Sequence, residues 1–398
     1  MTFANVSISS GLVIPAMNGG ENQLNTDFYN ELISEMHKIG GQVTYQKNKG
    51  WFNPELLKLV LDNMMSKANV ECLFNIDIDK ITLENNTIKQ IYIKQNMLSE
   101  YIATEQRVKK LLFEPICARY VIDSTGNCEI GKICNCKFLN SKDEVQPISL
   151  RFIMSGIDLA AFSKWLLEFD SDREVTTAED INGQIHLSTA YTWDSKGWAL
   201  KPIFDKAVAD GVLKVSDTNY FQIFTIAGMP DSIAFNCPRI VDDIDINNPK
   251  ELSNALIAAR QSIYRLSEFC KKYLIGFEKS FISNIADQLG VRASNRIKGK
   301  YVYTIEDLKS GKTFEHPVLR SSYPVDVHSA KKDNSTLEKV KQYELPIESL
   351  MSDDIDNLFV IGRCLSADFL AQGALRIQPS CFSMGEGVAK YIASKSKH

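Results

Sequence analysis

The sequence predicts a mixed α/β fold made of at least two units. Residues 118–126 form a short apolar strand that ends in Ser-Thr-Gly, and residues 357–363 form a second that ends in Gly-Arg. Residues 147–157 form a further strand, and residues 220–240 contain two strands around a Gly-Met-Pro-Asp turn, which favours a separate, largely antiparallel sheet. Because domains contain about 100 to 200 residues each, the 398 residues predict two or three domains.

The N-terminal part is expected to contain two helices and a β-meander. Residues 26–39 place apolar side chains at helical spacing, and two glycines follow them. Asn53 and Pro54 have the identities of a cap and a first helical residue, so a second helix begins there. Residues 70–95 then alternate apolar and polar side chains around Glu-Asn-Asn, which predicts strands with one solvent-exposed face.

The second half is expected to alternate helices with strands. Residues 249–273 carry an apolar stripe over the length of one long helix, and a further helical segment is expected to lead to Leu289-Gly290. The buried strand at residues 357–361 is followed by a predicted small-residue loop at residues 371–374 and by a helix that begins near Pro379.

Composition excludes several classes of partner. Forty-five Lys and Arg against 49 Asp and Glu give a net charge of -4, which removes the electrostatic argument for nucleic acid or an anionic membrane. No apolar stretch approaches the roughly 20 residues that a membrane span requires, and the N-terminus has no basic region of a secretory signal. The sequence thus predicts a cytoplasmic protein, and its nine Cys are expected to be reduced thiols.

Two strand ends have the composition of a ligand site. Glycine lets the backbone approach a ligand closely, so the Ser124-Thr125-Gly126 turn suits contact with a nucleotide, although an ordinary β-turn has the same composition. The helix near Pro379 presents unpaired N–H groups at its start, which stabilise negative charge. The bland alternative is that this C-terminal strand and helix simply pack together.

A third segment combines basic residues with a histidine. Arg292 and Arg296 are one helical turn apart and can clamp a carboxylate, whereas a solvated basic face is the alternative. His328 follows Asp326 closely and is a candidate proton-transfer group, or a structural histidine.

Cysteines and aromatic residues give weaker indications. Cys128, Cys134 and Cys136 lack a second ligand cluster, so we expect no metal site and interpret them as small buried hydrophobes. Trp193 and Trp198, with Tyr191, line either a substrate pocket or the core.

Four motifs together resemble those of one family. In order, they are VIDSTG, GVRASNRIKGKY, YPVDVH and the C-terminal NLFVIGRCLSADFLAQGALRIQPSCFSMGEGVAK. They resemble the FAD-dependent oxidoreductases of the two-domain, glutathione-reductase-like class. The resemblance implies a Rossmann-like FAD-binding domain formed by residues 1–146 and 341–398, with an inserted α+β substrate domain, residues 147–340, that contains an antiparallel sheet.

The resemblance also implies which residues form the site. Arg292, His328 and Arg376 are expected to face a small, anionic organic substrate that exchanges a hydride with FAD, and Arg296 lies on the same side. The residues expected to contact the flavin are Ser124, Thr125, Gly126, Gly362, Arg363, Ala371, Gln372, Gly373, Ile377 and Gln378.

One family motif is missing from the sequence. Members of the family begin with a strand, a GxGxxG turn and a helix that together hold the pyrophosphate, and no such loop occurs here, because Gly385-Glu386-Gly387 falls inside a predicted helix. The expected explanations are a truncated reading frame, a partner chain that supplies the unit, or a fold without tight FAD binding. The alternative function is therefore a cofactor-poor binding or scaffold subunit.

Overall fold

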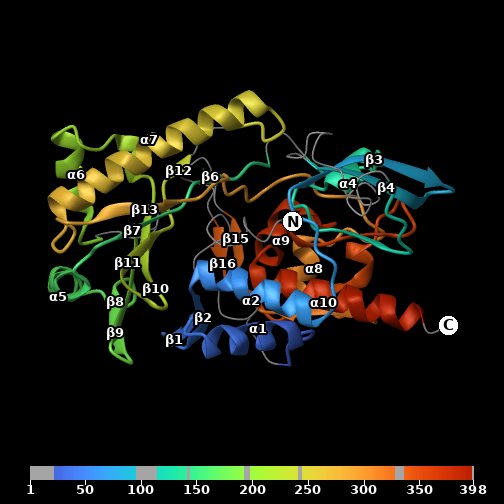
Figure 1. Cartoon of the computed structure of the whole chain (residues 1–398), viewed down its shortest axis with the longest axis horizontal. Helices are drawn as coiled ribbons and strands as arrows, with labels where there is room; N and C mark the ends of the chain where they lie inside the picture. Colours follow the sequence, from blue (N-terminus) through green and yellow to red (C-terminus); the bar gives the residue numbers. More distant parts are fainter. Residues whose placement is uncertain are drawn as a thin grey trace, which may run out of the picture.

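The computed structural model describes residues 22–95, 114–140, 144–191, 198–240, 244–327 and 336–396. The N-terminal and C-terminal segments, blue and red in Figure 1, lie together on one side, where α1 contacts α10. The green and yellow segments from the middle of the chain form the other side.

Helices and strands are mixed along the whole of these residues. The helices are α1 (Asp27–Lys38), α2 (Pro54–Lys67), α4 (Glu129–Ile133), α5 (Leu159–Phe169), α6 (Lys201–Ala209), α7 (Pro249–Tyr273), α8 (Ile305–Ser310), α9 (Phe369–Leu375) and α10 (Gln378–Lys395). The strands are β1 (Gln42–Tyr45), β2 (Asn48–Phe52), β3 (Ile76–Glu84), β4 (Thr87–Gln95), β5 (Val121–Asp123), β6 (Ile148–Ser149), β7 (Phe152–Ser155), β8 (Thr177–Ile181), β9 (Gln184–Tyr191), β10 (Phe221–Ile226), β11 (Met229–Phe235), β12 (Arg239–Ile240), β13 (Phe281–Ile285), β14 (Pro317–Ser321), β15 (Val325–Val327), β16 (Thr336–Glu338), β17 (Tyr343–Pro346) and β18 (Leu358–Val360).

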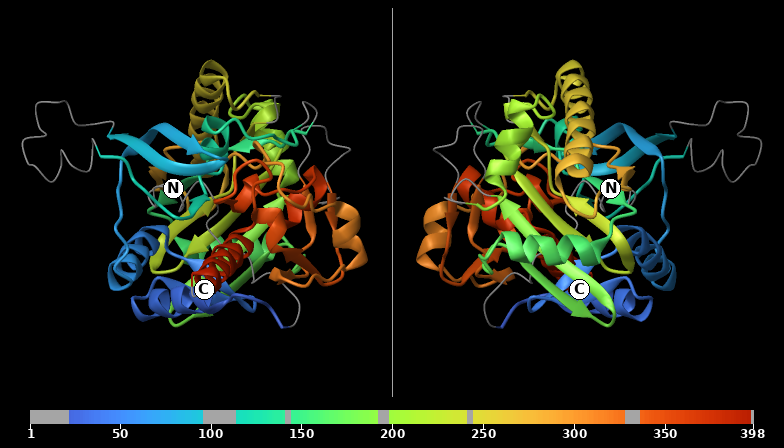
Figure 2. Two further views of the ribbon diagram at one scale, coloured as in Figure 1. Left: turned by 90° about the vertical axis from the view of Figure 1, so that its right-hand side faces the viewer. Right: turned by 90° about the vertical axis from the view of Figure 1, so that its left-hand side faces the viewer.

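A six-stranded antiparallel sheet forms the middle of the chain. Its order is β13-β7-β11-β10-β9-β8. Helix α5 contacts β8, β9 and β11, and it crosses in front of the strands in the right panel of Figure 2. Aromatic side chains fill the core: Phe152 stacks on Phe235 at 4.2 Å between ring centroids, and Phe204 of α6 meets Phe269 of α7 at 4.3 Å.

A short parallel pair, β5 and β18, joins the two ends of the chain. Val121 lies opposite Leu358, and Asp123 lies opposite Val360, so both strands end at the same edge. Behind them, buried Asn357 ties the pair to β4, because its side chain accepts a hydrogen bond from Ile88 N (2.9 Å) and donates to Ile88 O (3.0 Å). The same amide donates to Arg119 O (3.2 Å).

Residues that follow the antiparallel sheet share a core with the C-terminus. Val318 of β14, Leu345 of β17, Ala374 of α9 and Met384 of α10 belong to one buried cluster. Helix α9 lies so close to β15 that a Cβ atom on Gly373 would stand 2.6 Å from Val327 Cγ2. Only glycine allows that approach.

Many local expectations are confirmed. Helix α7 has the predicted bounds, and Asn53 caps α2 by accepting hydrogen bonds from two backbone N–H groups. The middle sheet is antiparallel, and the fold is mixed α/β. The domain boundaries at residues 146/147 and 340/341 stay a prediction, as does the missing first βαβ unit.

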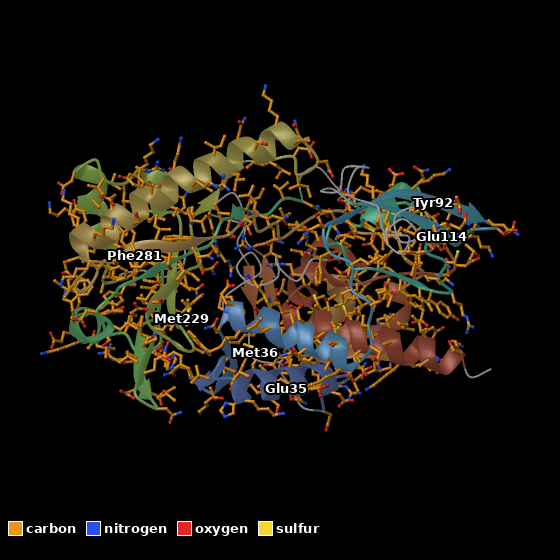
Figure 3. All side chains as sticks on the ribbon, in the orientation of Figure 1. Glu35, Met36, Tyr92, Glu114, Met229 and Phe281 are labelled. Atoms are coloured by element: carbon orange, nitrogen blue, oxygen red, sulfur yellow. The ribbon has the colours of Figure 1, made fainter. Side chains whose placement is uncertain are left out.

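Three local predictions are wrong. The segment before Leu289-Gly290 is strand β13 rather than a helix, because it pairs with β7 at the sheet edge, where Phe281 is 55% exposed (Figure 3). A contact so distant in sequence leaves no local signal. Residues 371–374 are helical because Asp368 caps α9, and the hairpin turn lies one residue earlier than expected, so that Met229 already starts β11.

We predict that Asn357→Ala lowers the free energy of unfolding by about 2–4 kcal/mol, because it removes the side-chain partner of two buried backbone groups, Ile88 N and Ile88 O. Thermal and urea unfolding, followed by circular dichroism, measure the loss. The matched control is Asn254→Ala on the exposed side of α7, which should change stability by less than about 0.5 kcal/mol. Equal stabilities for the two variants would contradict this role of Asn357.

Candidate functional site

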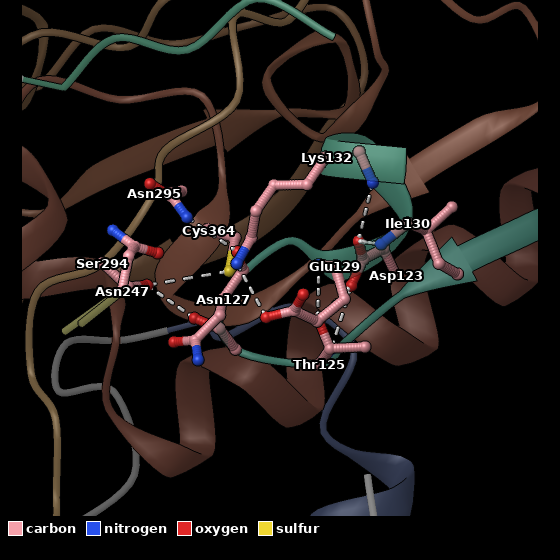
Figure 4. A network of polar contacts seen from close by, with 12 residues as sticks. Asp123, Thr125, Asn127, Glu129, Ile130, Lys132, Asn247, Ser294, Asn295 and Cys364 are labelled. Carbon is pink, nitrogen blue, oxygen red and sulfur yellow. Dashed lines mark hydrogen bonds and ion pairs between the residues drawn. The ribbon is translucent and has the colours of Figure 1, made fainter. Parts of the chain in front are cut away.

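Asp123 organises the turn that follows β5. Its fully buried carboxylate accepts hydrogen bonds from Thr125 N (3.0 Å), Thr125 Oγ1 (2.7 Å) and Ile130 N (2.9 Å) (Figure 4). Thr125 Oγ1 accepts a further bond from Glu129 N (2.9 Å). The turn and the start of α4 are thus held as one rigid unit, with every carboxylate oxygen of Asp123 used internally.

Gly126 and Arg363 lock the two strand ends together. Gly126 has a φ of +82°, and a Cβ atom there would stand 2.9 Å from the Arg363 guanidinium. Arg363 donates to Asn127 Oδ1 (2.9 Å) and to Ser294 Oγ (3.3 Å). Ser294 Oγ in turn donates to Gly126 O (2.6 Å). Burial lowers the pKa of Arg363, so this cation is held by neutral oxygens in a dry environment.

Gln372 connects this edge to the segment that carries Arg292. Its Nε2 donates to Arg292 O and to Arg363 O, each at 3.1 Å. Its Oε1 is buried and has no hydrogen-bond partner within the described parts of the chain. The same holds for both amide atoms of Gln378 and for Arg376 Nε. Buried polar atoms are nearly always paired in folded proteins, so these unpaired atoms make this edge a candidate ligand site.

Helix α10 begins beside these atoms. Its N-cap, Ile377, provides no side-chain cap, and Pro379 stands in its first turn. The first N–H groups of a helix lack internal partners and carry partial positive charge. The start of α10 therefore favours an acceptor that bears negative charge.

Arg292 and Arg376 each donate a hydrogen bond to an oxygen of residues 146–147. Arg292 Nη1 donates to Pro147 O (2.6 Å), and Arg376 Nη2 donates to Gln146 Oε1 (3.3 Å) and Asp326 O (2.9 Å). Burial holds the pKa of Arg292 well below its usual value, and the neighbouring arginines lower it further. Arg376 Nη2 also lies 3.9 Å from Asp326 Oδ2. Because guanidinium groups offer paired donors to an anion, Arg292 and Arg376 are a candidate anion site.

The structure brings most of the predicted cofactor residues to this edge. Gly126, Gly362, Arg363 and Gln372 surround the ends of β5 and β18. Ser124 and Thr125 belong to the turn after β5, and Ile377 and Gln378 begin α10. Ala371 and Gly373 lie inside α9 and are buried against other protein elements. The role of each residue stays a prediction.

Arg292 and Arg296 do not form the expected clamp. Residues 291–296 are not helical, and the two side chains take separate partners. Arg296 donates to Leu139 O (3.0 Å) and pairs with Glu144, whereas Arg292 donates to Pro147 O. His328 and Trp193 lie outside the described residues. Trp198 packs in the core against Phe204 and Phe221.

Sequence analysis missed two arginines, Arg151 and Arg239, that lie near Arg292. Both are single basic residues within apolar segments, and such a residue gives no motif. Their pKa values are lowered by burial and by the other arginines, that of Arg151 to about 10. The available signal was a charge inside a predicted buried strand, because isolated buried charges are costly and mark functional sites.

The cysteine cluster is structural. Cys128, Cys134 and Cys136 are buried free thiols, as expected. Burial raises the pKa of Cys128 and Cys136, and it raises that of Cys134 to about 11. Protonated thiols are poor nucleophiles and poor metal ligands. The described residues contain no group of side chains able to hold a metal ion, and within them no helix has the length and apolar character of a membrane span.

Two parallel strands that end in glycine turns beside the start of a helix define a nucleotide-binding α/β protein. The family model described as FAD dependent oxidoreductase matches residues 7–398, and the chain belongs to this family. It is accordingly an oxidoreductase whose cofactor is FAD.

Solved structures show more distant similarity. A geranylgeranyl bacteriochlorophyll reductase-like protein from Thermoplasma acidophilum is 12% identical with a TM-score of 0.40, over 96% of this chain and 71% of the other. A formate oxidase variant from Aspergillus oryzae is 12% identical with a TM-score of 0.31, over 94% and 71%. L-proline dehydrogenase from P. horikoshii is 8% identical with a TM-score of 0.35, over 94% and 64%. No curated protein matches this sequence. The family assignment rests on the family model.

The unpaired atoms fit a flavin. The pyrimidine edge of an isoalloxazine ring presents carbonyl acceptors and an N–H donor, and the buried amides of Gln372 and Gln378 offer complementary donors and acceptors. The start of α10 favours the negative charge that a reduced flavin carries. The residues at this edge therefore suit the cofactor of the family.

We predict that Gly126→Ala lowers the melting temperature more than Gly183→Ala. The two glycines have nearly equal φ angles, +82° and +81°, but a Cβ atom on Gly183 meets nothing within 4 Å. Both variants incur a backbone cost of about 1–2 kcal/mol. Gly126→Ala must in addition displace Arg363 from Asn127 and Ser294. Differential scanning calorimetry measures the difference, and equal losses would show that Arg363 does not hold the strand ends together.

Proposed function

We propose that FAD binds at the common edge of β5 and β18 and that the enzyme transfers a hydride between a small anionic organic substrate and this flavin. The observation that carries the proposal is the bonding of Gln372 to both Arg363 O and Arg292 O. These two hydrogen bonds place the edge of β5 and β18, where Gln372 and Gln378 have unpaired amide atoms, next to the segment of Arg292. When bound, FAD supplies the hydride acceptor or donor.

The residues of this chain divide the work of binding. Gln378 contacts the polar edge of the flavin with its amide, and the N–H groups at the start of α10 stabilise negative charge there. Arg292 and Arg376 hold the substrate anion and orient the reacting carbon. Their burial excludes water, which strengthens each of these interactions. His328 is the proposed proton donor or acceptor, by its place after Asp326 in the sequence.

The proposal includes the predicted division of the chain. Residues 1–146 and 341–398 form the FAD-binding domain, and residues 147–340 form the substrate domain. Support comes from the six-stranded sheet, whose buried core draws mainly on residues 150–286. Residues 303–327 pack against α9 and α10 and would connect the two domains.

The visible spectrum of the purified chain tests the proposal. After incubation with FAD and desalting, we expect a flavin band close to one per chain, which small organic acids bleach under anaerobic conditions. A colourless protein would favour a scaffold subunit that needs a partner chain. A flavin band that no anionic substrate bleaches, while neutral ones do, would contradict the proposed substrate class.

A variant at Gln378 tests the proposed cofactor contact. We predict that Gln378→Leu weakens FAD binding about tenfold, the effect of one buried hydrogen bond of about 1.4 kcal/mol. The apoprotein should be no less stable, because the variant removes amide atoms that lack partners. Fluorescence titration with FAD and apoprotein melting measure the two effects. Gln261→Leu, at an exposed position of α7, is the control. Unchanged FAD affinity would remove Gln378 from the site.

A further inference from the structure

Three polar side chains lie side by side where β7, β11 and β10 adjoin. Phe152 of β7 is paired with Phe235 of β11, and Arg151 precedes the first of these residues as Asn236 follows the second. On its other side, Asn236 donates its backbone N–H to Gln222 O of β10 (2.8 Å). Side chains alternate between the two faces of a sheet, so Arg151, Asn236 and Gln222 form a polar row on one face.

The polar row lies on the face of the sheet that is turned away from α6. On the other face, Phe235 contacts Phe221 (6.0 Å between ring centroids), and Phe221 meets Phe204 of α6 (4.9 Å). Phe224 of β10 shares the face of the polar row, and its ring meets that of Trp51 of β2 at 5.7 Å. The polar row therefore faces the N-terminal part of the chain.

One side of the Asn236 amide is bound and the other is free. Its Nδ2 donates to Gln222 Oε1 (2.6 Å), and the Tyr220 hydroxyl donates to the same oxygen (2.7 Å). These bonds fix the amide so that Asn236 Oδ1 points away from Gln222. Within the described parts of the chain, this buried Oδ1 has no hydrogen-bond partner, and neither has the buried Nε of Arg151. An unpaired acceptor and an unpaired donor thus lie on neighbouring strands.

The polar row adjoins the arginines to which the proposed function assigns the substrate. Ser149, two residues before Arg151, pairs with Gly290, two residues before Arg292. Burial and the charges of nearby arginines, Arg151 among them, hold the pKa of Arg292 well below its usual value. Burial lowers the pKa of Arg151 to about 10, and the charge of Arg376 contributes. Such effects require short distances, so one substrate can reach both sets of side chains.

We propose that the polar row recognises a hydroxyl or amino group next to the carboxylate of the substrate. This inference rests on the proposed function and narrows its substrate class. Asn236 Oδ1 accepts a hydrogen bond from the hydroxyl or amino group, and Arg151 donates to the carboxylate. Because adjacent strands are only about 4.8 Å apart, the two groups are on neighbouring carbon atoms. The substrate is thus a 2-hydroxy acid or a 2-amino acid.

The first experiment compares three acids of equal length on the intact, FAD-loaded chain under anaerobic conditions. Racemic lactate, racemic alanine and propionate differ only at the second carbon, and calorimetric titration gives their dissociation constants. We expect lactate or alanine to bind at least about tenfold more tightly than propionate, the effect of one buried hydrogen bond. Preference for lactate identifies a hydroxy acid, and preference for alanine identifies an amino acid. Equal binding of all three, tightest binding of propionate, or no binding overturns the proposal.

Asn236→Leu distinguishes recognition of the substituent from a structural role. The variant keeps the approximate size of the side chain and removes Oδ1. We expect it to lose the tenfold preference, while its affinity for propionate, which offers Oδ1 no donor, changes less than about twofold. Asn254→Leu, at an exposed position of α7, is the matched control and should keep the preference. Equal weakening of the preferred acid and of propionate would make Asn236 structural and overturn the assignment.

The two proposals fail separately. If the chain holds no flavin but still prefers lactate or alanine, the proposed function falls and the polar row stands as a binding site. If the chain holds flavin that anionic substrates bleach, yet binds propionate as tightly as the other two acids, only the inference about the polar row falls. The wild-type titration decides this even where a variant does not fold.

Discussion

The parallel pairing of β5 with β18 is the constraint on which the site depends. It joins residues 121–123 to residues 358–360, more than 230 positions away, and so places two glycine turns at one edge. Neither strand has more than three residues, and a pair this short is stable only when other contacts support it. Asn357 supports it from behind, and Arg363 closes it in front. Loss of either contact would separate the turn of Gly126 from the start of α10.

Polar groups in this region fall into two kinds. Asp123 is buried and fully used by the backbone of its own turn, so it builds the scaffold and has no capacity left for a ligand. The amide atoms of Gln378 are also buried, but they have no hydrogen-bond partner among the described residues. Unpaired polar atoms beside a rigid frame, whose own polar atoms are all hydrogen-bonded, are typical of a binding site. The frame keeps the unpaired atoms from forming hydrogen bonds with each other.

The sequence predicts local elements well because they depend on neighbouring residues. The cap at Asn53 and the apolar stripe of α7 need no information from elsewhere in the chain. The prediction of a helix at β13 was wrong because this segment pairs with the distant strand β7. The predicted clamp of Arg292 and Arg296 does not form because their segment is not helical. For the candidate site, motifs singled out Gly126, Gly362 and Arg376, whose roles stay predictions. The motifs did not point to Arg151 and Arg239, because these single basic residues come near Arg292 only in the folded chain.

Gln372 connects the edge of β5 and β18, where we propose that FAD binds, to the segment that carries Arg292. Its Nε2 donates to both Arg363 O and Arg292 O, so these two segments are held at a fixed distance from each other. Arg292 is repelled by the charges of the arginines near it, and that repulsion opposes compaction of the segments that carry them. In the proposed function, Gln372 would therefore hold the segment of Arg292, which faces the substrate, next to the edge where FAD binds.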